Sequence, residues 1–176
     1  MAATIELDEY NGAGPETAAT ITHNVTNLNY GSADAANLIA ADNPITPNTN
    51  TYKGSFAKYT KLHVTNMGGV SKVNTIKFWR VQGSPTAGDL HRTNATTSGY
   101  ANKTYQTPTT ALLTFYNVES SEPSGANVGI NSALAGEITS VAVNSLSDFM
   151  WHQVQVSSST TVGAVMTTRV QWNEVA

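Results

Sequence analysis

The sequence contains four histidines, His23, His63, His91 and His152, and imidazole is the side chain best suited to proton transfer and to zinc binding. No two of them stand at a metal-binding spacing such as H-x-H or H-E-x-x-H. A zinc site would therefore need residues far apart in the sequence to converge. We expect no metal site and no cofactor, and we expect His63 and His152 to be surface or half-buried residues of strands.

Carboxylates are the other groups that could do chemistry here. The acidic residues lack the spaced pattern of a calcium-binding loop, although an irregular calcium site in a loop stays open as an alternative. Glycoside hydrolysis needs two opposed carboxylates, and the spacing of Glu119, Glu122, Glu137 and Asp148 favours no pair. Serines are abundant, but the G-x-S-x-G nucleophile elbow is missing. We therefore predict no catalytic residues and a protein that is not an enzyme.

Charge and composition exclude several partners. Charged residues make up only 12% of the chain, and nine Lys and Arg cannot form the basic surface that nucleic-acid binding requires. No apolar run approaches the about 20 residues that span a bilayer. Cysteine is absent, which excludes disulfides and thiolate sites. The first residues, MAATIELDEYNGAG, show no signal peptide, so we expect synthesis in a cytoplasm and no membrane partner.

The elements that would position any site are strands. Apolar and polar residues alternate in TIELDEY, AKYTKLHVTNM, DFMWHQVQV and AVMTTRVQW. KVNTIKFWRVQG changes its apolar face at Phe78 and Trp79, which predicts a β-bulge or cover on both faces. Turn signals such as NMGGVS separate these runs at the spacing of a sandwich. We predict an all-β fold: one antiparallel β-sandwich, Ig-like or jelly-roll-like, over residues 15–176, with a long exposed excursion around 82–105.

One segment breaks the strand pattern. In GSADAANLI, Ser32 or Asp34 can cap a helical turn by accepting from backbone N–H groups, and the alanines favour that turn. Leu38 would then reach the edge of the core. We predict one short helical turn near residues 32–39, with a plain strand connection as the alternative.

The apolar residues of the N-terminal segment and the tryptophans are predicted to have different roles. Residues 1–14 are predicted to form an N-terminal arm or edge strand that adds to a neighbouring sheet, with Ile5, Leu7 and Tyr10 as candidate interface residues. The three tryptophans lie in apolar strands, so we expect them to pack in the core rather than to stack on sugars.

Four stretches carry a wider pattern: TNLNYGSADAANLIAADNPITPNTNTYKGSFAKYTKLHVTN, NTIKFWRVQG, SSEPSGANVGIN and TTRVQWNEV. Taken in order they resemble a family of structural proteins of tailed bacteriophages, and the likeness runs from Ile5 to Val175. The excursion around 82–105 departs from the family pattern. The resemblance implies a protein of the virion, with no known catalytic residues to carry over.

The role that the resemblance implies first is decoration of the capsid. The partners would then be the major capsid protein or other virion proteins, bound by a homo-oligomer or by lattice-bound copies. A tail or baseplate accessory is the alternative, as is a carbohydrate-binding adhesin module with a glycan as its partner.

Overall fold

The computed structural model describes residues 1–12, 19–46, 53–83, 90–94, 116–118, 120–156 and 167–176. Its strands are β1 (Thr4–Asn11), β2 (Thr20–Thr22), β3 (Lys53–Gly54), β4 (Lys58–Asn66), β5 (Lys72–Gln82), β6 (Leu90–Asn94), β7 (Tyr116–Asn117), β8 (Glu137–Ile138), β9 (Met150–Val156) and β10 (Thr167–Val175). The part of the chain that the structure describes holds no helix able to cross a membrane.

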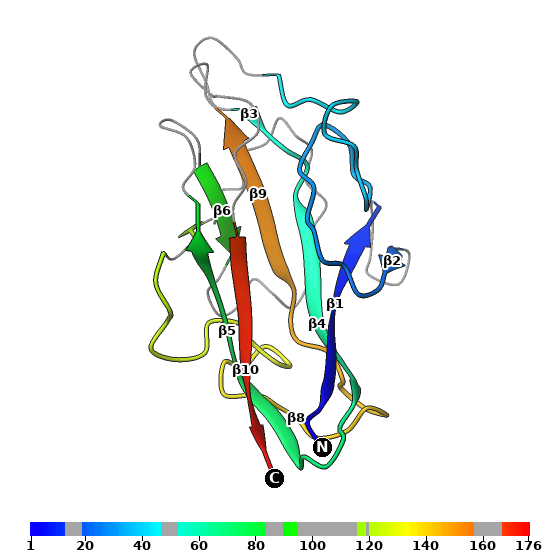
Figure 1. The fold of residues 1–176 in the computed structure, drawn as a ribbon, viewed down its shortest axis with the longest axis vertical. Helices are drawn as coiled ribbons and strands as arrows, with labels where there is room; N and C mark the ends of the chain where they lie inside the picture. Colours follow the sequence, from blue (N-terminus) through cyan, green and yellow to red (C-terminus); the bar gives the residue numbers. More distant parts are fainter. Residues whose placement is uncertain (13–18, 47–52, 84–89, 95–115, 119, 157–166) are drawn as a thin grey trace.

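Two antiparallel sheets pack against each other, which confirms the predicted all-β sandwich (Figure 1). The larger sheet has the order β2-β1-β4-β9-β6-β7, and β3 also pairs with β9. The smaller sheet has the order β10-β5-β8. The core lies between them and includes Val73, Ile76 and Ile138, all fully buried.

The alternation in β4 shows how the sequence builds this core. Leu62 and Val64 are buried, whereas Lys61 and His63, which alternate with them, are only half-buried on the opposite face. This is the predicted two-residue period of a strand in a sheet. β1 runs antiparallel to β4, and this pairing sets Glu6 directly opposite His63.

Of the two explanations for the change of apolar face in β5, the structure shows the second: both faces of the strand are covered at Phe78 and Trp79. Phe78 and Trp79 are adjacent, point to opposite faces and are both buried. The pairing with β10 shifts by one residue at two places: near Thr75, whose φ of 52° is rare outside glycine, and between Arg80 and Gln82. Irregularities therefore lie on both sides of the two aromatic residues in β5, but not between them.

The structure corrects the prediction that residues 1–14 form an N-terminal arm or edge strand. β1 lies inside the larger sheet, between β2 and β4. Tyr10 is buried and packs edge to face on Phe149, with ring centroids 5.0 Å apart. Tyr10 is thus a core residue of this chain rather than an interface residue. Ile5 and Leu7 are half-buried against the core.

The predicted excursion around 82–105 also needs correction where the structure describes it. Residues 90–94 form β6, which pairs with β9 in the larger sheet. This segment is therefore not one continuous exposed loop. The remainder of the excursion, apart from residues 82 and 83, lies outside the described residues.

The predicted helical turn near 32–39 is wrong, because the described residues contain no helix. The Asp34 carboxylate is engaged elsewhere: it accepts from Gly12 N at 2.7 Å and therefore does not cap the turn. Ser32 instead donates its backbone N–H to the carbonyl of Asn43, 3.0 Å away, which closes the loop. Leu38 is buried, as expected. The segment is a strand connection built from turns.

Gly31 is the residue on which this loop depends. A Cβ at Gly31 would lie 2.6 Å from the carbonyl oxygen of Asn43 and 2.2 Å from Leu38 Cδ2. Because one of these atoms is backbone, we expect Gly31→Ala to destabilise the protein by about 1–3 kcal/mol. Urea unfolding measures the effect. Gly125→Ala is the control, since nothing lies within 4 Å of its Cβ position; equal losses in the two variants would contradict the assignment.

Candidate functional site

Four side chains with metal-binding chemistry converge on the outer face of the larger sheet. Glu6 and Asp8 lie two residues apart on β1, so they share a face. His63 lies across from Glu6 on β4, and His23 follows β2 directly. We call this set the carboxylate–histidine cluster. One donor atom from each member lies within 4.8 Å of all the others.

The distances within the cluster are short. His23 Nδ1 lies 3.0 Å from Asp8 Oδ1 and 3.5 Å from Glu6 Oε1. His63 Nδ1 lies 3.0 Å from Asp8 Oδ2 and 3.2 Å from Glu6 Oε1. Each imidazole therefore faces both carboxylates through its Nδ1 atom.

Burial differs between the members. The Asp8 side chain is 1% exposed, Glu6 and His63 are 22% and 26% exposed, and His23 is 58% exposed. The Nδ1 atom of His63 is itself buried and makes no hydrogen bond within the described residues. Its separations from the carboxylates are short, but its orientation does not suit an N–H···O bond. The cluster thus contains a buried nitrogen that lies close to carboxylate oxygens without a hydrogen bond to them.

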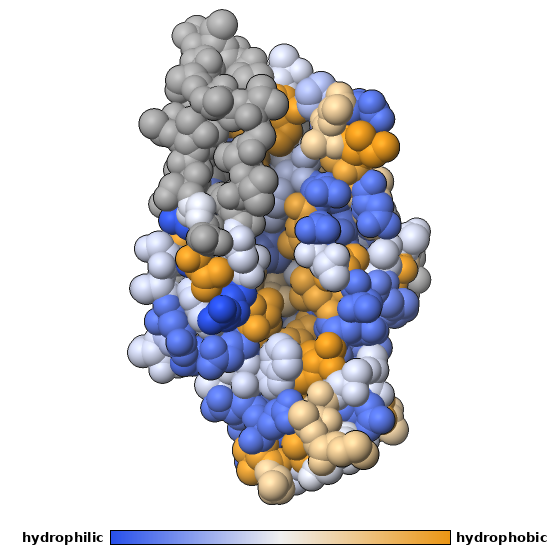
Figure 2. All heavy atoms as spheres, in the orientation of Figure 1, coloured by the Kyte–Doolittle hydropathy of each residue, from blue (hydrophilic) through white to orange (hydrophobic). Residues whose placement is uncertain are grey.

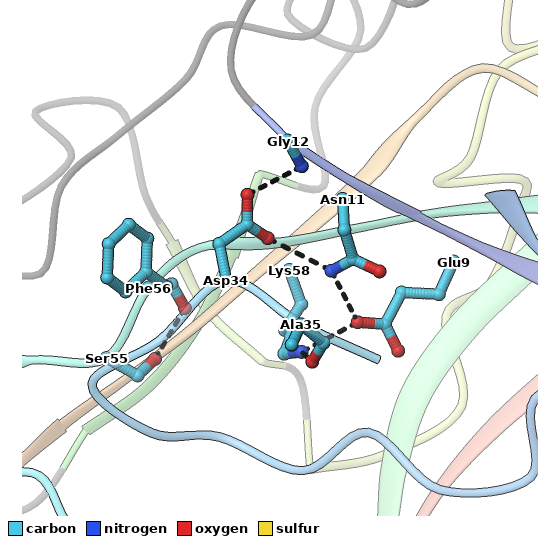
Figure 3. Close-up of polar contacts among 8 residues, drawn as sticks. All are labelled: Glu9, Asn11, Gly12, Asp34, Ala35, Ser55, Phe56 and Lys58. Carbon is cyan, nitrogen blue, oxygen red and sulfur yellow. Dashed lines mark hydrogen bonds and ion pairs between the residues drawn. The ribbon is translucent and has the colours of Figure 1, made fainter. Parts of the chain in front are cut away.

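A second constellation is a buried ion pair, drawn in Figure 3. Lys58 Nζ lies 2.7 Å from Glu9 Oε1, and the side chains are 0% and 1% exposed. The ammonium also donates to the carbonyl of Ala35. Asn11 Nδ2 lies 3.0 Å from both Glu9 Oε1 and Asp34 Oδ1. These bonds tie β1 and β4 to the loop that begins at Gly31, so the network is architectural.

A pair of buried histidines forms the third constellation. The rings of His91 and His152 stack with centroids 6.4 Å apart. His152 Nε2 lies 3.0 Å from Thr60 Oγ1, and His91 Nε2 lies 3.3 Å from the Tyr30 hydroxyl. Burial, and then the charge of Arg80, lower the pKa of His91 to about 4. Burial, and then His91, lower the pKa of His152 to about 3. Both rings are therefore neutral at pH 7.

Burial also raises the pKa of the Tyr30 hydroxyl, with a smaller contribution from Glu9. The group beside His91 is consequently a neutral phenol. The pair of histidines, Thr60 and Tyr30 offer hydrogen bonds between elements, and His152 also contacts Phe78 edge to face at 5.0 Å. This arrangement belongs to the packing of the interior.

One side of the sandwich is incompletely covered. Four apolar side chains are half-buried against the core there: Ile5 and Leu7 of β1, and Val170 and Trp172 of β10. We call these residues the open flank. The two strands meet at their ends, where Ala3 N donates to Glu174 Oε2 at 3.2 Å. Figure 2 shows apolar side chains gathered along the middle of this view, between hydrophilic margins.

The predictions for individual histidines and tryptophans agree with the structure in part. The structure places His63 half-buried, as expected, but His152 is buried, so the prediction of a surface or half-buried residue is wrong for it. Trp79 and Trp151 are buried and Trp172 is half-buried, which agrees with core packing. The carboxylate–histidine cluster was not predicted from the sequence, because its members come from three separate segments.

The acidic residues weighed for hydrolysis are engaged separately. Asp148 accepts from Ser132 N at 2.8 Å, and Glu122 pairs with Lys77 at 2.8 Å. Glu137 pairs with Lys72, and this hydrogen bond is the main cause that lowers the pKa of Glu137. Glu119 lies outside the described residues.

Comparison of the chain with protein-family models, with curated proteins and with solved structures finds no match.

Proposed function

We propose that this protein is a non-enzymatic structural protein of a tailed-phage virion that decorates the capsid. The proposal rests on the sequence resemblance and on one structural observation, the open flank beside the edge of β10. Among the described residues, β5 is the only strand that pairs with β10. A nine-residue edge with half-covered apolar side chains beside it offers both ingredients of association with another chain.

The low charge of the chain supports dense packing on a lattice. With 12% charged residues and a net charge of −3, copies of the protein repel one another weakly. Exposed β10 residues such as Thr167 and Arg169 would form the polar rim of such a contact. The major capsid protein or a second copy of this chain would then cover the flank. A position on the tail or baseplate would use the same surface.

A charge placed in the flank tests the proposal. Val170→Lys is expected to reduce binding to phage heads lacking the protein by at least about 10-fold, because a desolvated lysine without a partner costs more than 1.4 kcal/mol. Co-sedimentation with purified heads measures the occupancy. Val143→Lys is the matched control, since Val143 is 64% exposed and is not one of the four flank residues.

The fold of both variants is checked by circular dichroism and thermal unfolding. Stoichiometric recovery of the wild-type protein from particles, with loss of Val170→Lys alone, supports decoration. Failure of the folded wild-type protein to bind any particle component, or equal binding by both variants, would contradict it.

A carbohydrate-binding module on the particle is the second candidate, and an amide-lined hollow favours it. The hollow has a volume of about 400 Å³ and is lined by residues 22–27, 29 and 37–39. Its asparagines include Asn27 and Asn29, which are exposed and able to bond sugar hydroxyls. Saturable oligosaccharide binding that Asn27→Ala abolishes would favour this candidate over decoration.

A further inference from the structure

We propose that the carboxylate–histidine cluster is a structural site for a divalent transition-metal ion of the zinc class. The proposal goes beyond a role in the particle, and it concerns residues that no motif in the sequence marks. It rests on three observations: the spacing of the donor atoms, their chemical kinds, and a buried nitrogen that makes no hydrogen bond.

The spacing fits a tetrahedral ion. Bonds of about 2.0–2.2 Å at tetrahedral angles place neighbouring donor atoms about 3.3–3.5 Å apart. The four nitrogen–oxygen separations in the cluster are 3.5, 3.0, 3.2 and 3.0 Å. The two separations to Asp8 involve different oxygens of its carboxylate, and one donor atom from each residue lies within 4.8 Å of all the others. A tetrahedral ion would draw these four atoms closer together. Four protein donors also make a closed site, as structural zinc sites are.

The kinds of donor select the metal. Two imidazole nitrogens and two carboxylates suit zinc and its transition-metal neighbours. Calcium and magnesium prefer six or more oxygen ligands, and this cluster has two nitrogens among its four donors. Two carboxylates with two neutral imidazoles also carry the charge that one divalent cation balances. The cluster therefore favours zinc over the alkaline-earth ions.

The buried groups of the cluster would be stabilised by a bound cation. The Asp8 carboxylate is 1% exposed and is paired with His23 Nδ1 at 3.0 Å, and a cation would further stabilise this buried charge. His63 Nδ1 is buried and makes no hydrogen bond among the described residues, although it lies 3.2 Å from Glu6 Oε1 and 3.0 Å from Asp8 Oδ2. A cation between them would satisfy the nitrogen lone pair and the carboxylates together. A hydrogen bond from His63 Nδ1 to either carboxylate, without a metal ion, would be poorly aligned.

The expected consequence of binding is a staple between three segments. β1 and β4 are already paired, but the chain after β2 is held by fewer bonds, such as Val25 N to Leu7 O at 2.8 Å. His23 is the first residue of that chain and lines the amide-rich hollow. Metal binding through His23 would fasten this wall of the hollow to the larger sheet.

Metal titration of the chelator-treated full-length protein tests the site. Calorimetry with Zn²⁺ is expected to show one ion per chain, and Co²⁺ is expected to give the visible spectrum of a tetrahedral complex. At free Zn²⁺ about 100 times Kd, the Tm should rise by about 5–10 °C. Mg²⁺ and Ca²⁺ at millimolar concentration should not raise the Tm or displace Zn²⁺.

Variants assign the ligands. His23→Ala and Glu6→Gln should weaken Zn²⁺ binding at least about 10-fold, since even outer-shell changes often have that effect. The metal-free Tm of His23→Ala should stay near that of the wild type, because His23 is largely exposed. Glu122→Gln, which removes an exposed carboxylate outside the cluster, should bind as the wild type does.

Three results would overturn the proposal. These are the lack of saturable one-to-one Zn²⁺ binding, equal affinity in wild type and His23→Ala, and stronger binding of Ca²⁺ than of Zn²⁺. None of these outcomes bears on binding to phage heads, so the two proposals fail separately.

Discussion

Lys58→Met is expected to destabilise the protein by about 3–5 kcal/mol, the loss typical when one partner of a buried ion pair is removed. Lys58 Nζ lies 2.7 Å from Glu9 Oε1, and neither side chain is exposed by more than 1%. Methionine fills similar space but leaves the carboxylate in the interior. Glu9 then keeps the Asn11 amide as a donor, and its Oε2 atom already makes no hydrogen bond among the described residues. Urea unfolding at pH 7 measures the loss.

Two further variants separate a buried charge from lost packing. Lys58→Met combined with Glu9→Leu should recover most of the stability, because hydrophobic replacement of a whole buried pair is often neutral or stabilising. Lys77→Met breaks a surface pair with Glu122, 2.8 Å away, and should cost about 0–1 kcal/mol. A loss in Lys58→Met no larger than that in Lys77→Met would contradict the assignment.

Acid is expected to destabilise the fold through the two buried histidines. Their pKa values in the folded protein are about 4 and about 3, because burial disfavours the charged ring. In the unfolded chain histidine titrates near 6.5, so below that pH the unfolded state binds protons that the folded state does not. The stability is fully present above pH 6.5 and is lost as pH falls toward 4. The slope for two such groups approaches about 2.7 kcal/mol per pH unit.

The contribution of the pair is isolated by substitution. The free energy of unfolding is measured by urea at intervals from pH 7.5 to pH 4 for the wild type, His152→Gln and the double variant His91→Gln/His152→Gln. The slope between pH 6 and pH 4.5 should fall by about 1.4 kcal/mol per pH unit for each histidine removed. Parallel curves for the three proteins would show that the buried rings do not cause the acid sensitivity.

The strands were predictable where one face of the chain is apolar. In β4, Leu62 and Val64 alternate with Lys61 and His63, and this local pattern is enough to predict a strand and its inner face. The same reasoning failed for β9, where six of seven residues are buried. His152 reads as a polar outward residue, yet β9 is a central strand covered by neighbours on both faces. Burial of a strand by segments distant in the sequence cannot be recognised from the residues of that strand alone.

The helical turn failed for a related reason. Local propensity favours a cap at Asp34, but its carboxylate instead accepts from the backbone N–H of Gly12, which directly follows β1 and lies 22 residues away along the chain. A tertiary hydrogen bond thus outweighs an intrinsic preference.

The carboxylate–histidine cluster shows the same limit at the level of a site. The i, i+2 spacing of Glu6 and Asp8 on a strand predicts a shared face, but their partners depend on the register between β1 and β4 and on the position of His23. Register is fixed by core packing and turn geometry, neither of which the spacing of four histidines reports. Short-range motifs reveal sites built within one segment, and this one is built from three.

A density map of the assembled phage particle is the most direct test of the proposed structural role. We expect this chain at symmetry-related positions on the head, with the open flank of β1 and β10 against a neighbouring chain. Particles without the protein, or copies whose flank faces solvent, would contradict it.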